Sequence, residues 1–255
     1  MNSHLVTTKA YTFQMFPGIG TVINVIAIVM GSIFGRLGGN RVPERTRSLI
    51  TDVLGFITLI SAAAAIKELW SDDFVGATVQ GGPILVVLTS LILGAALGSW
   101  INVDYRLTQI GETLKKRFAK DDNLFVEGFV TASLLFVIGP LAILGSISDG
   151  MSKGIEQLLL KSSLDFFAAI AFSAAFGIGV LLSFIPVGIY QGVWTIIGIF
   201  LGNILSQAQV ASMTAVGGVL LIGIGLKLLN VRNISVGNLL PALAFAPFIL
   251  QLFQK

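Results

Sequence analysis

The sequence predicts an all-α transmembrane protein of about eight helices. Hydrophobic residues make up 55% of the 255-residue chain and charged residues only 11%, whereas soluble domains average about 25% charged residues. Long apolar runs recur along the chain, and each approaches the roughly 20 residues that a helix needs to cross the hydrocarbon core. Backbone groups in lipid must be hydrogen-bonded internally, so continuous runs of this length indicate helices and not the alternating strands of a barrel.

These runs define the candidate spans and the domain organisation. The fifth and sixth runs form one stretch that is too long for a single crossing, and Pro186 and Gly188 mark the expected turn. Residues 1–16 form a polar leader without the features of a signal peptide, and residues 17–255 form a single polytopic membrane domain. The expected spans are 17–37, 50–69, 82–102, 125–147, 164–184, 187–206, 212–230 and 236–253.

Basic residues gather in alternate connections, which predicts the orientation. They follow the first, third and seventh spans: Arg36, Arg41, Arg45, Arg47, Arg106, Lys115, Lys116, Arg117, Lys120, Lys227 and Arg232. Cytoplasmic loops are enriched in Lys and Arg, so these connections are expected on the cytoplasmic side of the bacterial inner (plasma) membrane, with both termini outside. Residues 104–124 have helical apolar spacing beside cations, which predicts a helix along the membrane interface; a solvated linker helix is the alternative.

Glycines four residues apart recur in three spans, as Gly31/Gly35, Gly94/Gly98 and Gly198/Gly202. Such pairs let another helix backbone approach closely. They are consistent with a homodimer, or with packing inside one chain. Loose matches between the following spans suggest inverted three-helix repeats at 82–184 and 187–253, an arrangement typical of secondary transporters; chance similarity among helices rich in Gly, Ala and Leu is the alternative.

Two spans contain helix breakers. Proline inside a helix removes one hydrogen bond and clashes with the preceding turn, so Gly139-Pro140 is expected to kink or break the fourth span. Pro241, with Asn238 just before it, does the same in the eighth. Backbone groups freed in this way must face protein or a water-filled cavity. The expected substrate or ion pathway comprises Gly139, Pro140, Gly145, Ser146, Asn238 and Pro241. Kinks that only shape the packing are the alternative.

Ionisable residues near the spans are few, and such residues are functional candidates. The candidates for ion or proton coupling are Glu127, near the inner end of the fourth span, and Asp149, Lys161 and Asp165, near the outer ends of the fourth and fifth. Lys161 and Asp165 are four residues apart and can pair on one helix. An interfacial ion pair of little energetic value is the alternative.

Several function classes find no support in the sequence. The chain has no cysteine and a single histidine, His4, so thiolate metal sites and zinc-protease motifs are absent. No phosphate-binding loop indicates nucleotide use. We therefore expect no enzyme and no cofactor, while a metal stays open. The formal charge of +3 resides in loops, which argues against nucleic-acid binding.

Several segments resemble one family. Ile138–Gly150, Lys161–Asp165, the opening Pro17–Asn24 and the closing Asn238–Pro241 look like the hallmarks of the YqgA/YdfK-like bacterial membrane proteins. The similarity runs from about residue 15 to the end. It implies a bacterial plasma-membrane protein, and it supplies neither a substrate nor catalytic residues.

Broken helices, clustered charges and repeats together predict a secondary transporter or channel. Its partners would be the lipid bilayer and a small solute or ion. The alternative is a non-transporting membrane scaffold or sensor subunit, for which we expect a tightly packed bundle without a polar cavity.

Overall fold

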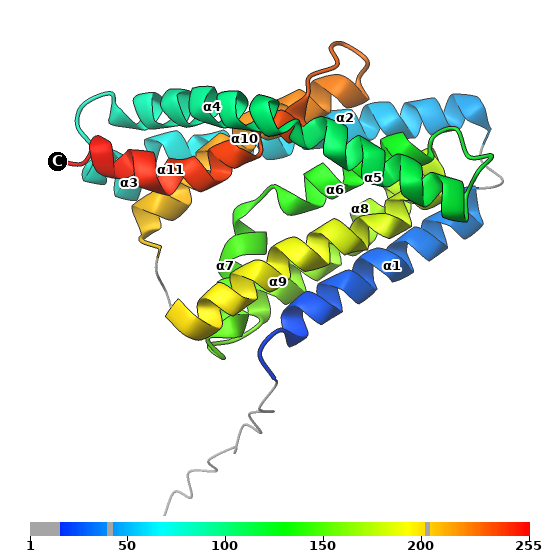
Figure 1. Cartoon of the computed structure of the whole chain (residues 1–255), viewed down its shortest axis with the longest axis horizontal. Helices are drawn as coiled ribbons and strands as arrows, with labels where there is room; N and C mark the ends of the chain where they lie inside the picture. Colours follow the sequence, from blue (N-terminus) through cyan, green and yellow to red (C-terminus); the bar gives the residue numbers. More distant parts are fainter. Residues whose placement is uncertain (1–15, 40–42, 202–204) are drawn as a thin grey trace, which may run out of the picture.

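The computed structural model describes residues 16–39, 43–201 and 205–255, which are helical along most of their length (Figure 1). The predicted leader, apart from Phe16, lies outside the described residues. The α-helices are α1 (Ile19–Gly39), α2 (Glu44–Ile66), α3 (Asp72–Ala77), α4 (Gly82–Ile101), α5 (Val103–Phe118), α6 (Phe125–Val137), α7 (Pro140–Gly150), α8 (Glu156–Phe176), α9 (Phe184–Leu201), α10 (Gln207–Leu228) and α11 (Pro241–Leu252). Three 3-10 segments join them: η1 (Lys67–Trp70), η2 (Gly177–Ser183) and η3 (Val236–Leu239).

The predicted all-helical class is confirmed. By length and composition, five stretches of the described residues can cross a membrane, and the bent pair α6–α7 makes a sixth. The residues from Val236 to Leu252 form a shorter apolar helix. The expected count of eight crossings and the two inverted repeats stay predictions.

Helices α8 and α9 form a hairpin within one apolar stretch. Along α1, Gly20 meets Leu158 and Gly31 meets Phe166, so α8 runs parallel to α1. Thr21 meets Thr195 and Gly188 meets Val25, so α9 runs antiparallel to α1. The turn between α8 and α9 is η2. It precedes the turn expected at Pro186 and Gly188, because Pro186 fits the first turn of α9, where its missing N–H has no helical acceptor.

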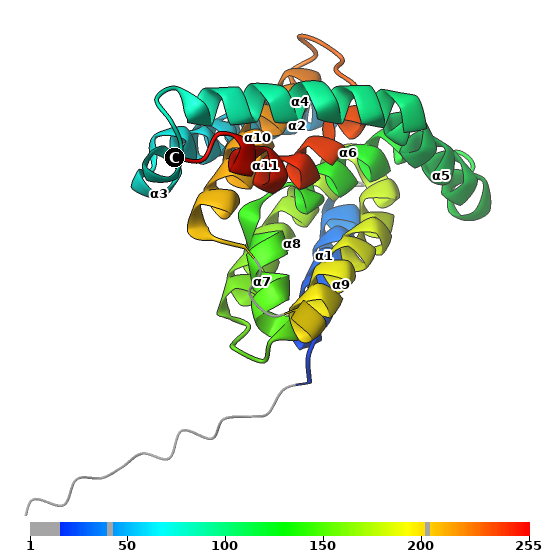
Figure 2. The same cartoon turned by 60° about the vertical axis from the view of Figure 1, so that its left-hand side comes forward.

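The helices associate as two bundles. The α1 bundle comprises α1, α6, α7, α8 and α9, and the α2 bundle comprises α2, α3, α4, α10 and α11. Figures 1 and 2 show the α2 bundle lying across one side of the α1 bundle, with α6 at the junction. Helix α2 touches α8 where the bundles meet. Neither bundle is continuous in sequence, and both cut across the predicted repeat boundaries.

Glycine pairs hold helices together within this chain. A methyl group at Gly31 or Gly35 would overlap the backbone carbonyls of Phe166 and Ile170 on α8. On α4, Gly94 meets the backbone of α11 and Gly98 that of η3 in the same way, and Gly198 on α9 meets α7. These glycine faces are therefore occupied inside the chain and lend no support to a homodimer. Gly202 lies outside the described residues.

The basic connections gather at one end of the bundles. The backbone N–H of Asp104 donates to Asn238 Oδ1 (3.0 Å), and the N–H of Gly237 donates to Asp104 Oδ1 (3.2 Å), which joins the start of α5 to η3. Arg36 in the last turn of α1 approaches Gly177 of η2. At the opposite end, the N–H of Val79 donates to the carbonyl of Phe253 (3.0 Å). This arrangement matches the alternation of basic loops seen in the sequence.

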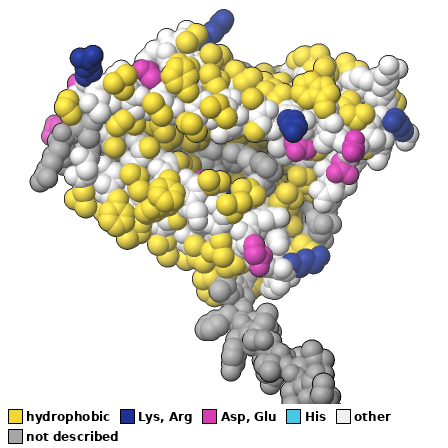
Figure 3. Space-filling view, turned by 180° about the vertical axis from the view of Figure 1, so that it is seen from behind, with side chains coloured by type: hydrophobic (Ala, Val, Ile, Leu, Met, Phe, Trp, Pro, Cys, Tyr) yellow, Lys and Arg dark blue, Asp and Glu magenta, His cyan; other side chains and the backbone are white. Residues whose placement is uncertain are grey.

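Apolar side chains dominate the outer surface. Figure 3 shows them across the middle of one face, with lysines, arginines and carboxylates mostly toward its margins. Such a surface is typical of a protein that contacts lipid tails. The segment expected along the interface is α5, which packs Leu107 and Leu114 inward and exposes Ile110 and Phe118.

The close contact between α1 and α8 yields a stability prediction. We expect Gly35→Ala to lower the free energy of unfolding by about 1–3 kcal/mol, the typical cost of overpacking, because the new methyl group overlaps the carbonyl of Ile170. Gly38→Ala on the same helix is the control, since nothing lies within 4 Å of its added methyl group. Thermal unfolding in detergent measures both, and equal midpoints would contradict the helix pairing.

Candidate functional site

The site is built around a break between α6 and α7. Helix α6 ends at Val137 and α7 begins at Pro140, with the two axes bent by 63°. Gly139 has φ 145° and ψ 148°, a conformation essentially restricted to glycine. The break lies midway along the stretch Phe125–Gly150, as the Gly-Pro pair predicts. It leaves carbonyl groups of α6 and N–H groups of α7 without helical partners.

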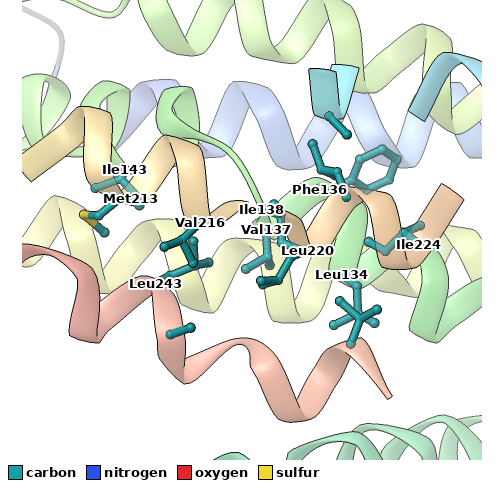
Figure 4. Packing of buried hydrophobic residues seen from close by; sticks show 14 of the residues in the cluster. Leu134, Phe136, Val137, Ile138, Ile143, Met213, Val216, Leu220, Ile224 and Leu243 are labelled. Atoms are coloured by element: carbon teal, nitrogen blue, oxygen red, sulfur yellow. The ribbon is translucent and has the colours of Figure 1, made fainter. Parts of the chain in front are cut away.

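Side chains from both bundles pack around this break. Figure 4 shows Val137 and Ile138 close to Val216 and Leu220 of α10, with Leu243 of α11 nearby. Protein therefore covers the broken backbone on the side of α10 and α11, in keeping with the need to shield irregular backbone from lipid.

A cavity of about 390 Å³ lies beside the break, between the two bundles. Helices α2 and α10 of the α2 bundle form one wall, and α6, α7 and α8 of the α1 bundle form the other. The lining is Leu54, Ile57, Thr58, Ser61, Ala65, Leu135, Phe136, Ile138, Gly139, Leu141, Ala142, Lys161, Leu164, Asp165, Ala168, Phe172, Thr214, Gly217 and Leu221. The volume suits a small organic molecule.

A buried ion pair from α8 faces this cavity. Lys161 Nζ donates to Asp165 Oδ2 at 2.7 Å, and both residues are only 6% exposed. Asn24 of α1 donates its Nδ2 to the same oxygen at 3.0 Å. Among the described residues, no donor reaches Asp165 Oδ1, and Lys161 has two further N–H groups. The pair thus offers both an acceptor and donors to a ligand in the cavity.

The position of this pair corrects the predicted span. The fifth span was expected at 164–184, which placed Lys161 and Asp165 near the outer membrane surface. Helix α8 instead runs over Glu156–Phe176, so Asp165 lies at its middle. The reason is electrostatic: the two opposite charges satisfy one another, and the helix can continue through them inside an apolar surrounding.

Other predicted residues of this region have structural roles. Gly145 lets α7 pack against Leu158 of α8, and Ser146 donates to the carbonyl of Ala142 in its own helix. Asp149 Oδ2 accepts the N–H of Gly20 at 2.9 Å. Because Gly20 lies at the start of α1, this carboxylate stabilises the positive end of the helix dipole. Asp149 therefore ties the end of α7 to α1 and does not reach the cavity.

Three predicted residues lie apart from the cavity. Asn238 caps the start of α5 through its bond to Asp104, at the basic end. Pro241 begins α11 and borders a separate hollow with Tyr190 and Trp194. Glu127 is exposed in the first turn of α6. The structure thus brings together Gly139, Lys161 and Asp165 of the predicted set. Pro140 begins α7 at the break.

The wall from α2 and α10 escaped the sequence prediction. Thr58 and Thr214 line the cavity, yet their hydroxyls bond only to carbonyls of their own helices, Leu54 and Val210. Nothing in the sequence pairs α2 with α10, since about 150 residues separate them. The described residues hold no group of three or more His, Cys, Asp or Glu side chains that suits a metal ion.

The comparisons with known proteins agree with this picture. Residues 19–251 match the family described as "Protein of unknown function (DUF554)". The chain belongs to this family. It is 28% identical over 231 residues to the "Uncharacterized membrane protein YdfK" of Bacillus subtilis (strain 168), covering 91% of this chain and 95% of that protein. It is 29% identical over 241 residues to the "Uncharacterized protein YqgA" of Escherichia coli (strain K12), covering 89% and 94%.

No solved structure matches the chain. The resemblance drawn from the sequence is confirmed, and the chain is a membrane protein of a family whose function is not assigned.

The ion pair yields a second stability prediction. We expect Lys161→Met to lower the free energy of unfolding by about 3–5 kcal/mol, because it leaves the Asp165 carboxylate buried without its cation. Adding Asp165→Leu should restore much of the loss, since both charges are then gone. Lys153→Met, at an exposed lysine, is the matched control. Unfolding in detergent measures all three, and a harmless Lys161→Met would argue against the pair.

Proposed function

We propose that the chain is a secondary transporter or channel that moves a small solute or ion across the bacterial plasma membrane. The observation that carries this is a cavity at a mid-helix break, between two bundles, lined by the Lys161–Asp165 pair. Secondary transporters commonly bind their substrates at discontinuous helices near mid-membrane. The basic end of the bundles is assigned to the cytoplasm and both termini to the outside.

Asp165 is assigned the coupling role. Its Oδ2 is held by Lys161 and Asn24, while Oδ1 is left for a proton or cation. Binding there would weaken the attraction between Asp165 and Lys161, and would thereby make the ammonium group available to the transported solute. A single carboxylate can thus link ion occupancy to solute binding.

Access to the cavity would change by movement of one bundle against the other. Helix α7 is fixed within the α1 bundle, because Gly150 and Gly198 bring it into backbone contact with α9 and Asp149 ties it to α1. The facing wall belongs to α2 and α10, which meet across Gly55, Gly218 and Gly225. Sliding of two such rigid units around a fixed site is the usual route to alternating access.

A non-transporting scaffold or sensor subunit is the competing function. A scaffold has no need of a mid-helix break or of a cavity with a buried charge pair, both of which cost stability. The same residues give no ground for proposing catalysis, since they include no nucleophile beside a base.

Cysteine accessibility tests the transporter against the scaffold. The native chain contains no cysteine, so Thr58→Cys introduces a single thiol in the cavity. We expect a charged, membrane-impermeant thiosulfonate to modify it in liposomes at least about tenfold faster than Ile60→Cys, because water must reach a transport site and a lipid-facing thiol stays protonated and shielded. Ile60 is exposed on the same helix and does not line the cavity. If the reagent modifies Thr58→Cys as slowly as Ile60→Cys, whether it is added inside or outside the liposomes, the result would favour the scaffold.

Ion flux tests the role of Asp165. We expect liposomes containing the wild-type protein and a pH-sensitive dye to dissipate an imposed proton gradient faster than empty liposomes. Asp165→Asn should return the rate to that of empty liposomes, since an amide carries no proton. Glu127→Gln makes the same chemical change at an exposed site and should keep the wild-type rate. Unchanged flux in Asp165→Asn would remove this residue from the mechanism.

A further inference from the structure

The cavity opens sideways, toward the lipid. Two of its lining residues, Ile57 on α2 and Leu164 on α8, are 55% and 57% exposed, and they mark the mouth. Their exposed neighbours on the two helices are mostly apolar, namely Phe56, Ile60, Leu160 and Phe167. The polar exception is Ser61 of α2, which is exposed and also lines the cavity. Ile57 and Leu164 lie near the middle of their helices. The mouth therefore lies in mostly apolar outer surface, near the middle of both helices.

Apart from Ala65, one residue before the end of α2, the lining residues lie away from the ends of the bundles. Every residue around it belongs to α2, α6, α7, α8 or α10, or to the break at residues 138 and 139. A hydrophilic solute would have to cross hydrocarbon to reach the mouth in this conformation, which is unfavourable for every polar group left without a hydrogen-bond partner. A molecule already dissolved in the bilayer pays no such cost.

The walls and the ion pair define the chemistry of the occupant. Most of the lining is aliphatic or aromatic and continues from the mouth along both helices, which suits an apolar chain. At Lys161 and Asp165 the cavity presents free N–H donors and one free carboxylate oxygen. A protonated carboxylic acid matches both, because its O–H can donate to Asp165 Oδ1 while its carbonyl accepts from Lys161. An alkylammonium group can only donate and an ester can only accept, so each matches only one of the two partners.

We infer that the site takes a membrane-dissolved amphiphile with a single carboxylic-acid head, which enters between α2 and α8. Its apolar chain lies along Ile57 and Leu164, and its head reaches the Lys161–Asp165 pair. This inference rests on the proposed transport function and names its substrate class.

Photolabelling in lipid nanodiscs tests the inference. The probe is octanoic acid that carries a diazirine on its chain. We expect saturable labelling of the segments 54–65 and 161–172, competed by excess octanoic acid and at least about tenfold less by methyl octanoate, which lacks the O–H donor. Lys161→Met should weaken binding about tenfold or more, as expected for a lost hydrogen bond to a charged group.

Two lipid-facing substitutions on α8 provide a matched pair that spares the ion pair. Leu164→Trp places a bulky ring at the mouth and should abolish saturable labelling. Phe167→Trp alters a neighbouring lipid-facing side chain that does not line the cavity and should leave labelling intact. Labelling that never saturates, or that both variants share equally, would overturn the inference; a phospholipid tail or a helix of a second copy in the groove would give this result.

The outcomes also separate this inference from the transport function. Saturable labelling without any flux in liposomes would retain the amphiphile site and reject transport. Flux of a water-soluble solute that survives Leu164→Trp would retain transport and reject the lateral route.

Discussion

Backbone polar groups in an apolar surrounding need partners, and the break at Gly139 is the point where this fold must meet that requirement without a helix. An unbroken helix satisfies itself, so it can face lipid along its whole length. The segment from Val137 to Pro140 lacks these internal hydrogen bonds and must be shielded from lipid by protein. Side chains of α10 and α11 cover it on one side, as Figure 4 shows, and the cavity lies on another. The meeting of the two bundles at this level follows from the break.

The charge pair beside the break obeys the same constraint. A lone charge on Asp165 or Lys161 at the middle of α8 would carry a large desolvation penalty in an apolar surrounding, whereas the ion pair is neutral as a unit. Asp165 Oδ2 also accepts a hydrogen bond from Asn24 Nδ2. Neutrality lets the pair stay buried, and its unused donors and acceptor are the groups on which the proposed ligand site depends. A hydrophobic pair of the same volume would stabilise the helix as well or better, so stability alone does not account for the two charges.

The sequence predicts the parts of this fold that depend on local chemistry. The helical class follows from apolar runs, the break follows from Gly139-Pro140, and the shared location of the basic loops follows from their alternation. The close helix contacts at Gly31 and Gly35 follow from their spacing, although their partner does not. Pairings such as α1 with α8 depend on complementary surfaces far apart in the chain, which a single sequence leaves open.

The largest error in the predicted spans concerns the fifth, where charged residues interrupt an apolar helix. Residues 156–163 include Glu156 and Lys161, so an apolar-run criterion placed them in a loop and moved the fifth span eight residues toward the C-terminus. The four-residue spacing of Lys161 and Asp165 is visible in the sequence, but only the extent of α8 shows that Asp165 lies at mid-helix. Asn238 and Pro241, which the sequence assigns to the pathway, join α5 to η3 and begin α11, away from this cavity. Their place in a pathway stays a prediction.

The distribution of fixed and open contacts around α7 indicates which parts can move. Its C-terminal end is held by backbone contacts at Gly150 and by Asp149, whereas at its N-terminal end nothing lies within 4 Å of a methyl group added at Gly139. Open space beside a glycine in a glycine-only conformation permits rotation about the break at little steric cost. The side that can yield is therefore the cavity side, where α2 and α10 form the opposite wall. A ligand entering between α2 and α8 would press on that interface first, so the same contacts that admit the ligand are those whose rearrangement would open the cavity to water.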